Sequence, residues 1–251
     1  MTPEWILASD IDNTLTGDEK AVIELRDKIN ALRNKGSLFL ILTTGRRLEQ
    51  VISGIENEHL PEADAVISQV GTEIYMPPFK EGAPPLRDWE IKLKNEFSRQ
   101  TAESFVEGIE GVEIQPEMYN TPLKASFYMD NVKNAEEAVD TIKKRASKLP
   151  GYQVVWSSGR DLDIIPASAG KGKAISFLVQ DLGFTPHGVI PAGDSGNDRA
   201  MFEEFRKGIV VANAKPELKA IKTEPMGEKI FFATKNYAAG VMEGLKHYEI
   251  L

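Results

Sequence analysis

Two carboxylates stand two residues apart just after the first apolar run of the chain. Asp10 and Asp12 follow "EWILA", and Thr14, Thr16 and Gly17 complete the stretch "SDIDNTLTGD". A strand end needs residues that form a turn, which Thr and Gly provide, but it does not need paired carboxylates. Because side chains alternate along an extended segment, the two carboxylates point to different sides and can have different tasks. One can act as a nucleophile while the other moves a proton.

Three further polar sets stand at the ends of apolar runs or at the start of a helical stretch. Thr44, Gly45 and Arg46 follow "SLFLILT", Lys171 lies in "GKG", and "GDSGND" at residues 193–198 follows "GVIPA". In a doubly wound sheet the ligand crevice lies beyond the carboxyl ends of the strands. We therefore expect all four sets to converge on one crevice.

The residue types in these sets favour phosphoryl transfer assisted by a divalent cation. The aspartates of the first and last sets would repel one another unless a cation lay between them, and ligation by oxygen alone suits Mg²⁺. Thr44 with its flanking amides, and the ammonium of Lys171 at a helix start, are suitable donors to a phosphate group. Positioning and charge neutralisation supply most of the catalysis in such reactions.

Apolar runs alternate with amphipathic helical stretches in both end segments of the chain. Helices are predicted near residues 18–35, 47–57 and 197–206, after Pro216, and from about Ala238. Continuous Val/Ile/Leu runs between helices indicate an α/β fold with a doubly wound parallel sheet covered on both faces. This catalytic core is predicted at residues 1–79 and 160–251.

The middle of the chain has a different pattern. Strand-like runs with alternating character, such as "LKASFYMD", "YQVVWSS" and "DLDIIP", accompany helical stretches near residues 90–109 and 132–148. This pattern is typical of an antiparallel sheet with helices on one face. We therefore predict an inserted α+β domain at residues 80–159.

Composition excludes several classes of function. The 251 residues include 30 Lys and Arg, 38 Asp and Glu and no cysteine, which gives a net charge of −8. The negative net charge argues against general binding to nucleic acid or to anionic membranes. The absence of cysteine excludes a thiolate nucleophile, a disulfide and Cys-ligated zinc. No apolar run approaches the roughly 18 residues that span a bilayer, so we expect a cytoplasmic protein. We also expect the protein to be a monomer.

The four ordered motifs carry a resemblance to a known superfamily. "DIDNT", "LTTGR", Lys171 and "GDSGND" resemble the motifs of the haloacid dehalogenase superfamily of Mg²⁺-dependent phosphatases. The segment between the second and third motifs resembles the αβ cap domain of one branch. "GTEIY", "KASFYMD", "SSGRDLDIIP" and "GIVVANAKPEL" also resemble segments of the sucrose-phosphate phosphatase family.

That resemblance implies hydrolysis of a disaccharide phosphate, with sucrose 6-phosphate as the leading substrate and mannosylfructose phosphate as an alternative. The glycosyltransferase that makes this sugar phosphate is a candidate partner. The family pattern makes Asp10 the nucleophile and a metal ligand, and Asp12 the general acid/base, whose backbone carbonyl binds Mg²⁺. It also assigns Asp194 and Asp198 to the metal.

The same pattern assigns a second group of residues to the phosphate. Thr44 and Gly45 would hold the transferring group, Asn197 would assist them, and Lys171 would neutralise the charge. Lys173 is a rival to Lys171 because it lies two residues further along the same helix start.

Residues for sugar recognition are predicted from the family-like segments. The candidates are Arg46, Glu73, Lys124, Arg160 and Asp163. Trp89 and Trp156 are candidates for stacking on a sugar ring, with a role in the core or at a domain interface as the alternative.

Two other functions stay open at this point. A phosphomutase uses the same nucleophile and returns the phosphoryl group to a sugar, and a sugar-phosphate-binding protein keeps the fold without turnover. Asp12 favours a phosphatase over a dehalogenase, because a sugar alkoxide needs a proton on departure and a halide does not.

Overall fold

A seven-stranded sheet forms the centre of the larger part of the molecule. The computed structural model describes residues 2–251, and the strand order in this sheet is β11-β10-β9-β1-β2-β3-β4. All neighbours are parallel except β4, which runs antiparallel to β3 at one edge. The strands are β1 (Trp5–Asp10), β2 (Leu38–Thr43), β3 (Ala65–Ser68), β4 (Glu73–Tyr75), β9 (Val189–Gly193), β10 (Gly208–Val210) and β11 (Ile230–Phe232).

Helices cover both faces of this sheet, as the alternating helical and apolar segments predict. The α-helices of this part are α1 (Glu19–Asn34), α2 (Leu48–Asn57), α3 (Arg87–Lys94), α6 (Lys171–Asp181), α7 (Arg199–Phe205), α8 (Pro216–Lys219) and α9 (Tyr237–His247). Leu7 on β1 packs in one cluster with residues of α1, α2 and α9, while its neighbours Ile6 and Ala8 pack in another with residues of α3 and α6. Alternation along a fully buried strand therefore supplies both hydrophobic layers.

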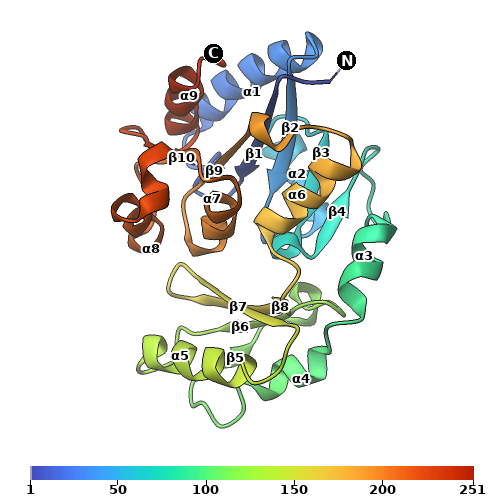
Figure 1. The fold of residues 1–251 in the computed structure, drawn as a ribbon, viewed down its shortest axis with the longest axis vertical. Helices are drawn as coiled ribbons and strands as arrows, with labels where there is room; N and C mark the ends of the chain where they lie inside the picture. The colour runs from blue at the N-terminus through green and yellow to red at the C-terminus, as the bar shows by residue number, and fades with distance from the viewer. Residues whose placement is uncertain (1) are drawn as a thin grey trace.

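The strand order reverses direction at β1, so the ligand crevice is expected at the carboxyl ends of β1 and its two neighbours. β1 pairs with β2 on one side and with β9 on the other, so the two halves of the sheet run outward in opposite directions. The carboxyl ends of these strands face the smaller part of the molecule (Figure 1). A topological switch point of this kind is where open α/β sheets bind ligands.

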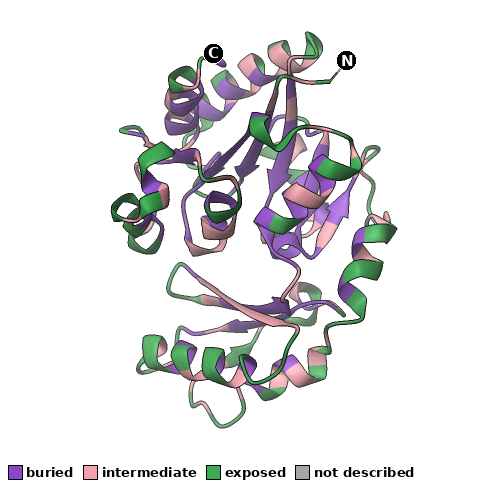
Figure 2. Cartoon of the chain, viewed as in Figure 1, coloured by how far each residue is buried: buried purple, intermediate pink, exposed green. Residues whose placement is uncertain are grey.

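The smaller part, which we call the cap, is a four-stranded antiparallel sheet with two helices on its outer face. Its strands are β5 (Glu113–Ile114), β6 (Ala125–Tyr128), β7 (Tyr152–Ser157) and β8 (Asp161–Pro166) in the order β5-β6-β8-β7, and its helices are α4 (Arg99–Ser104) and α5 (Ala135–Ala146). Phe127 and Leu162 point toward the helices and are buried with them, whereas the outer surface of α5 is exposed (Figure 2). The opposite face of the cap sheet lies toward the large sheet (Figure 1).

The cap differs at both ends from the inserted domain predicted at residues 80–159. Trp89 and Leu93 of α3 are buried in the cluster that covers the large sheet, so α3 packs with the core. β8 lies beyond residue 159 but pairs with β6 and β7, so the chain returns to the core only after Pro166. The single helix predicted near residues 90–109 is two helices, because Ser98 caps a new one by accepting the amide of Thr101.

Candidate active site

A buried lysine lies at the centre of the crevice. Lys171 is the first residue of α6, is fully buried, and donates from Nζ to Asp10 Oδ1 at 2.6 Å, to Asp198 Oδ1 at 2.6 Å and to Asn197 Oδ1 at 3.0 Å. The helix start is fixed from behind by Gly71, where a Cβ would lie 2.3 Å from the carbonyl carbon of Gly170. Only glycine allows this close approach, so the loop after β3 helps to aim Lys171.

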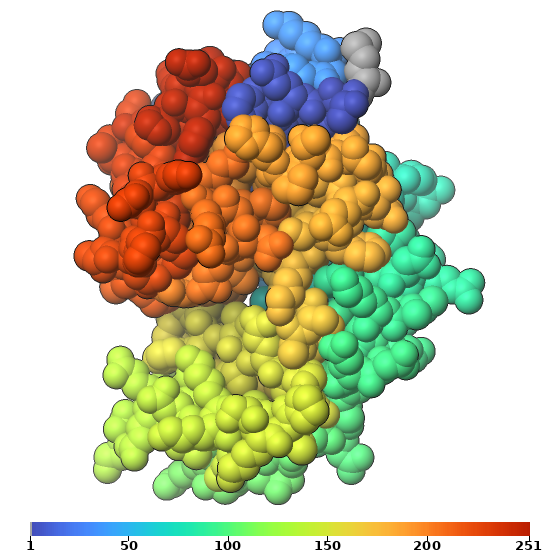
Figure 3. All heavy atoms as spheres, viewed as in Figure 1, coloured from blue at the N-terminus to red at the C-terminus, as the bar shows by residue number. Residues whose placement is uncertain are grey.

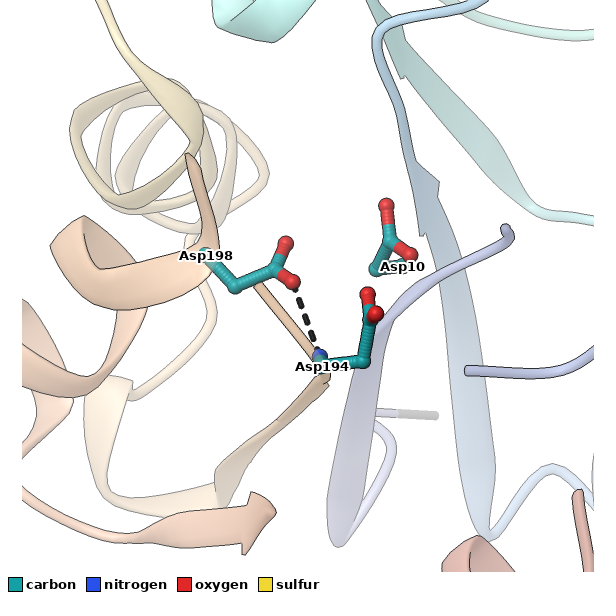
Figure 4. A group of neighbouring side chains, drawn as sticks. All are labelled: Asp10, Asp194 and Asp198. Atoms are coloured by element: carbon teal, nitrogen blue, oxygen red, sulfur yellow. Dashed lines mark hydrogen bonds between the residues drawn. The ribbon is translucent and has the colours of Figure 1, made fainter. Parts of the chain in front are cut away.

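Three aspartates surround the lysine. Asp10, Asp194 and Asp198 each place a carboxylate oxygen within 4.8 Å of the others, and all three are buried. Figure 4 shows Asp10 and Asp194 directed toward one another, with Asp198 approaching from the start of the helix beyond β9. Asp198 Oδ2 accepts the amides of Asp194 (2.9 Å) and Ser195 (3.0 Å), which fixes its carboxylate.

The charge in this cluster is unbalanced. Burial raises the pKa of Asp10 well above its ordinary value, and the neighbouring Asp198 carboxylate raises it further, against the lowering effect of Lys171. Burial and Asp198 likewise raise the pKa of Asp194 to about 7. Burial alone would lower the pKa of Lys171, but Asp10 and Asp198 outweigh it and raise that pKa above its usual value. Among the three aspartates, Lys171 thus donates to Asp10 and Asp198 only, and neither it nor Lys215 offsets the rise in the pKa of Asp194.

This donor set fits a hard divalent cation. Both oxygens of Asp198 already have donors, whereas in the described chain Oδ2 of Asp10 and Oδ2 of Asp194 accept no hydrogen bond from protein groups. Oxygen ligands and uncompensated negative charge are what Mg²⁺ requires, and Mg²⁺ keeps several waters or substrate oxygens beside one or two carboxylates. Asp10 and Asp194 are thus the two side chains best placed to hold a metal.

Asp12 lies on the other side of the strand end, as alternation predicts. Its side chain is half exposed and accepts three hydrogen bonds from the Arg46 guanidinium at 2.7–3.2 Å. Arg46 also donates to Glu58 at 2.8 and 2.9 Å. Burial alone would lower the pKa of Arg46, but the hydrogen bonds to Glu58 and Asp12 outweigh it and raise the pKa. Arg46 therefore holds Asp12 in one orientation beside the crevice.

The loop after β2 carries Thr44 and Gly45, the two residues predicted to hold the phosphoryl group. Thr44 is fully buried, its amide donates to Ile67 O at 2.9 Å, and its Oγ1 accepts the Arg46 amide at 3.0 Å. The Thr44 amide is consequently engaged in the sheet, because it extends the β2–β3 pairing. Gly45 lines the crevice.

A cavity of about 320 Å³ lies between the polar face of the cap sheet and a core side that includes Asp10, Asp12, Gly45 and Asp194. Four of the five sugar candidates line it: Arg46, Lys124, Arg160 and Asp163. Lys124 Nζ lies 3.5 Å from Asp163 Oδ1, which also accepts Ser126 Oγ–H at 2.6 Å. The space-filling view shows the hollow between core and cap from one side (Figure 3).

The remaining candidates lie elsewhere. Glu73, on edge strand β4, accepts hydrogen bonds from Ser68 Oγ and the Tyr75 hydroxyl and does not line the cavity. Lys173 is exposed and donates to the carbonyl of Ala167.

The two tryptophans also lie outside this cavity. Trp89 is buried in the core, where its Nε1–H donates to Gly71 O at 3.2 Å and its ring contacts Phe177. Trp156 packs against the apolar cluster of the cap. The structure supports the core alternative for Trp89, whereas Trp156 lines an adjoining cavity of about 760 Å³ together with Lys171 and Asn197, so its role in stacking stays a prediction.

Several cavity residues escaped prediction. Gln115, Tyr119, Tyr128 and Asp161 line the same cavity, and Gln115 donates to Asp161 Oδ1 at 2.9 Å. The alternation in "DLD" was an available signal for Asp161, since it shares a strand face with Asp163. Tyr119 lies in a turn whose direction no local pattern reveals.

None of the helices in residues 2–251 has the length and apolar character required to cross a membrane.

Two curated relatives match almost the whole of this chain. Mannosylfructose-phosphate phosphatase from Agrobacterium fabrum is 32% identical over 249 residues, which cover 99% of this chain and 98% of that protein. Sucrose-phosphatase 2 from Nicotiana tabacum is 30% identical over 255 residues, and the match spans 96% of this chain but only 58% of the longer plant protein.

Solved structures show the same fold. The X-ray structure of the sucrose-phosphatase from Synechocystis sp. PCC6803 in complex with sucrose and phosphate has a TM-score of 0.88 and 28% identity, with 98% of both chains covered. A haloacid dehalogenase-like hydrolase from Bacillus subtilis shares the fold with a TM-score of 0.68 at 20% identity, over 100% of this chain and 93% of that one.

Fold and site together define a phosphatase with the haloacid dehalogenase fold. Within that class, the chain belongs to the sucrose-6F-phosphate phosphohydrolase family, which matches residues 3–249.

Proposed function

We propose that the protein is a Mg²⁺-dependent phosphatase that hydrolyses a disaccharide phosphate, with sucrose 6-phosphate as the leading substrate. The observation that carries this proposal is the single cavity that has Asp10 and Asp12 on the core side and a polar sheet face on the cap side. The family match and the Agrobacterium relative support a sugar phosphate, and the latter makes mannosylfructose phosphate the second candidate.

Asp10 is the proposed nucleophile and Asp12 the proposed proton carrier. The Asp10 carboxylate attacks phosphorus, and the bond from phosphorus to the sugar oxygen breaks as Asp12 delivers a proton to that oxygen. In the second half, Asp12 takes a proton from water, whose oxygen attacks the phosphorus of the aspartyl-phosphate and releases phosphate. Arg46 keeps Asp12 beside the path of the leaving oxygen through the hydrogen bonds of 2.7–3.2 Å.

Charge neutralisation falls to Lys171 and a metal. Asp10, Asp194 and the backbone carbonyl of Asp12 would hold Mg²⁺, and Asp198 would orient Lys171 and the loop after β9. When bound, the cation would neutralise charge on the phosphoryl oxygens.

Binding of the phosphoryl group itself is assigned to the core loops. The Gly45 backbone, the Thr44 hydroxyl proton and the Asn197 side-chain amide are the proposed donors. Preorganised donors of this kind stabilise charge that develops in the transition state.

The cap side of the cavity supplies the proposed sugar contacts. Tyr128 on β6, Asp161 and Asp163 on β8, and the two residues Lys124 and Arg160 that directly precede these strands all line it. Charged and hydroxyl side chains on a rigid sheet suit the many hydroxyls of a disaccharide. A cavity of about 320 Å³ is within the range of small-molecule sites.

Phosphate release across a substrate panel tests the proposal. The panel compares kcat/KM with Mg²⁺ for sucrose 6-phosphate, mannosylfructose phosphate, glucose 6-phosphate, fructose 6-phosphate and phosphoglycolate. We expect a preference of at least about 100-fold for one disaccharide phosphate, or about 2.7 kcal/mol of differential transition-state binding. Equal, low rates on all five compounds would reject the substrate class, and no release from any of them would favour a binding protein.

A further inference from the structure

A tight turn of the cap rests on the core beside the catalytic loop. The β7–β8 hairpin turns through Ser158 and Gly159, which have φ values of 56° and 70°, and Arg160 N–H donates back to Ser157 O at 3.1 Å. This geometry is that of a two-residue hairpin turn with both central residues left-handed. The Ser158 amide points away from the hairpin and donates to Glu217 Oε1 of α8 at 3.2 Å.

The helix that carries Glu217 is anchored to the catalytic loop. Lys215 N–H donates to the backbone carbonyl of Asp194 at 2.7 Å, and α8 begins at the next residue. The cap turn is thus connected to one of the proposed metal ligands through a single short helix.

Close packing beside the hydrogen bond supports the same contact. A Cβ on Gly196 would lie 2.7 Å from the Trp156 carbonyl oxygen of the cap and 3.3 Å from Cγ of Glu217. The absence of a side chain at Gly196 therefore allows β7 to approach the loop between Asp194 and Asp198.

The turn leads directly into the sugar side of the cavity. Ser157, Ser158, Arg160 and Asp161 all line the cavity of about 320 Å³, whereas Glu217 lines an adjoining cavity of about 760 Å³, and Val70 and Asn197 line both. Glu217 does not line the smaller cavity, and its hydrogen bond to the Ser158 amide connects it to the turn residues that do.

We propose that Glu217 is a positioning residue that latches the cap to the core: by accepting the Ser158 amide, it holds the turn and the cavity residues that follow it over the catalytic loop. This inference rests on the proposed function, because it assigns the latch to binding of a substrate that spans core and cap. A small aryl phosphate that contacts only the core does not need the latch.

Kinetics of two Glu217 variants test the effect on the substrate. Glu217→Ala removes the acceptor of the Ser158 amide. It is expected to raise KM for sucrose 6-phosphate about threefold to tenfold, because it removes one partly exposed hydrogen bond. For p-nitrophenyl phosphate, kcat/KM is expected to change less than about twofold. Glu217→Gln keeps an acceptor oxygen and is expected to restore the wild-type KM. Glu203→Ala removes an acidic side chain from the same 760 Å³ cavity without touching the cap, and it is the matched control.

A distance measurement tests the latch without any activity. The chain has no cysteine, so Lys144→Cys in α5 and Lys246→Cys in α9 place two spin labels on exposed positions of cap and core. With Mg²⁺ and inorganic phosphate present, Glu217→Ala is expected to shift the label distances to longer and broader values, while Glu217→Gln keeps the wild-type distribution.

Two results would overturn the latch: unchanged distances in Glu217→Ala, or equal losses in Glu217→Ala and Glu217→Gln on both substrates. If the wild-type protein releases phosphate from no disaccharide phosphate, the proposed function fails, and the distance measurement alone still decides on the latch.

Discussion

Replacing Lys171 by methionine provides a quantitative test of the buried charge cluster. Lys171 is fully buried and holds two buried carboxylates at 2.6 Å, so its removal leaves Asp10 and Asp198 without their cation. Breaking a buried ion pair by removing one partner costs about 3–5 kcal/mol of folding stability. At about 2–4 °C per kcal/mol for a chain of this size, Lys171→Met should lower Tm by roughly 6–20 °C in EDTA.

Lys173→Met is the matched control for this variant. Lys173 lies on the same helix but is exposed and bonded only to the carbonyl of Ala167, so the change should stay within about 0.5 kcal/mol. Thermal unfolding followed by circular dichroism, with urea titration for the free energy of unfolding, measures both variants.

The pH dependence sharpens the test. In Lys171→Met the uncompensated carboxylates can relieve their repulsion by protonation, so the loss of stability should be smaller at pH 6 than at pH 8. Equal Tm values for the two methionine variants, or a Lys171→Met loss below about 1 kcal/mol at pH 8, would refute the account of the cluster.

Three further predictions follow from the same site. Asp10→Asn should lower kcat by at least about 10³-fold. It should leave Tm in EDTA unchanged or higher, because it removes a buried carboxylate whose pKa is raised by its surroundings. Normal phosphate release by this variant would reject Asp10 as the nucleophile. Asp12→Asn should lower kcat on sugar phosphates by about 10²–10⁴-fold. It should lower kcat on p-nitrophenyl phosphate much less, because nitrophenolate leaves without a proton. Equal losses on both substrates would contradict the role of Asp12 as the general acid. Because the pKa of Asp194 is raised to about 7, the protonated carboxyl stabilises the metal-free fold at low pH, and this contribution is lost as pH rises through 7. Mg²⁺ binds the ionised form, so the gain in Tm on adding Mg²⁺ should be larger at pH 8 than at pH 6, and a gain independent of pH would contradict the assignment.

The core of the site was predictable because parallel strands impose it. Asp10 ends β1 and Asp194 follows β9, and these strands are neighbours in the sheet, so the two motifs had to meet although they are far apart in the chain. The sequence pattern was sufficient here because the carboxyl ends of parallel strands share one edge.

The orientation of individual groups was less predictable. Nothing in "LTTGR" indicates that the Thr44 amide extends the β2–β3 pairing. Glu73 follows β3 in sequence, but the antiparallel turn into β4 directs it to Ser68 and Tyr75. The orientation of these groups depends on which strands pair in the folded protein, and local patterns in a single sequence do not show that pairing.

The cap was predictable in type but not in extent. Alternation in the strands indicated an antiparallel sheet, yet α3 joins the core because Trp89 fits between its helix and α6 beside Phe177. Amphipathicity shows that a helix has a buried face, but it does not show which of two sheets will bury it.

Acid quenching during turnover tests the central claim most directly. Wild-type protein is mixed with Mg²⁺ and sucrose 6-phosphate radiolabelled in the phosphate, stopped in acid within milliseconds and digested for peptide mapping. The account predicts a base-labile label on the peptide that contains Asp10, and none with Asp10→Asn. Release of labelled phosphate at the wild-type rate with no label on Asp10, or with label on another residue, would contradict the mechanism.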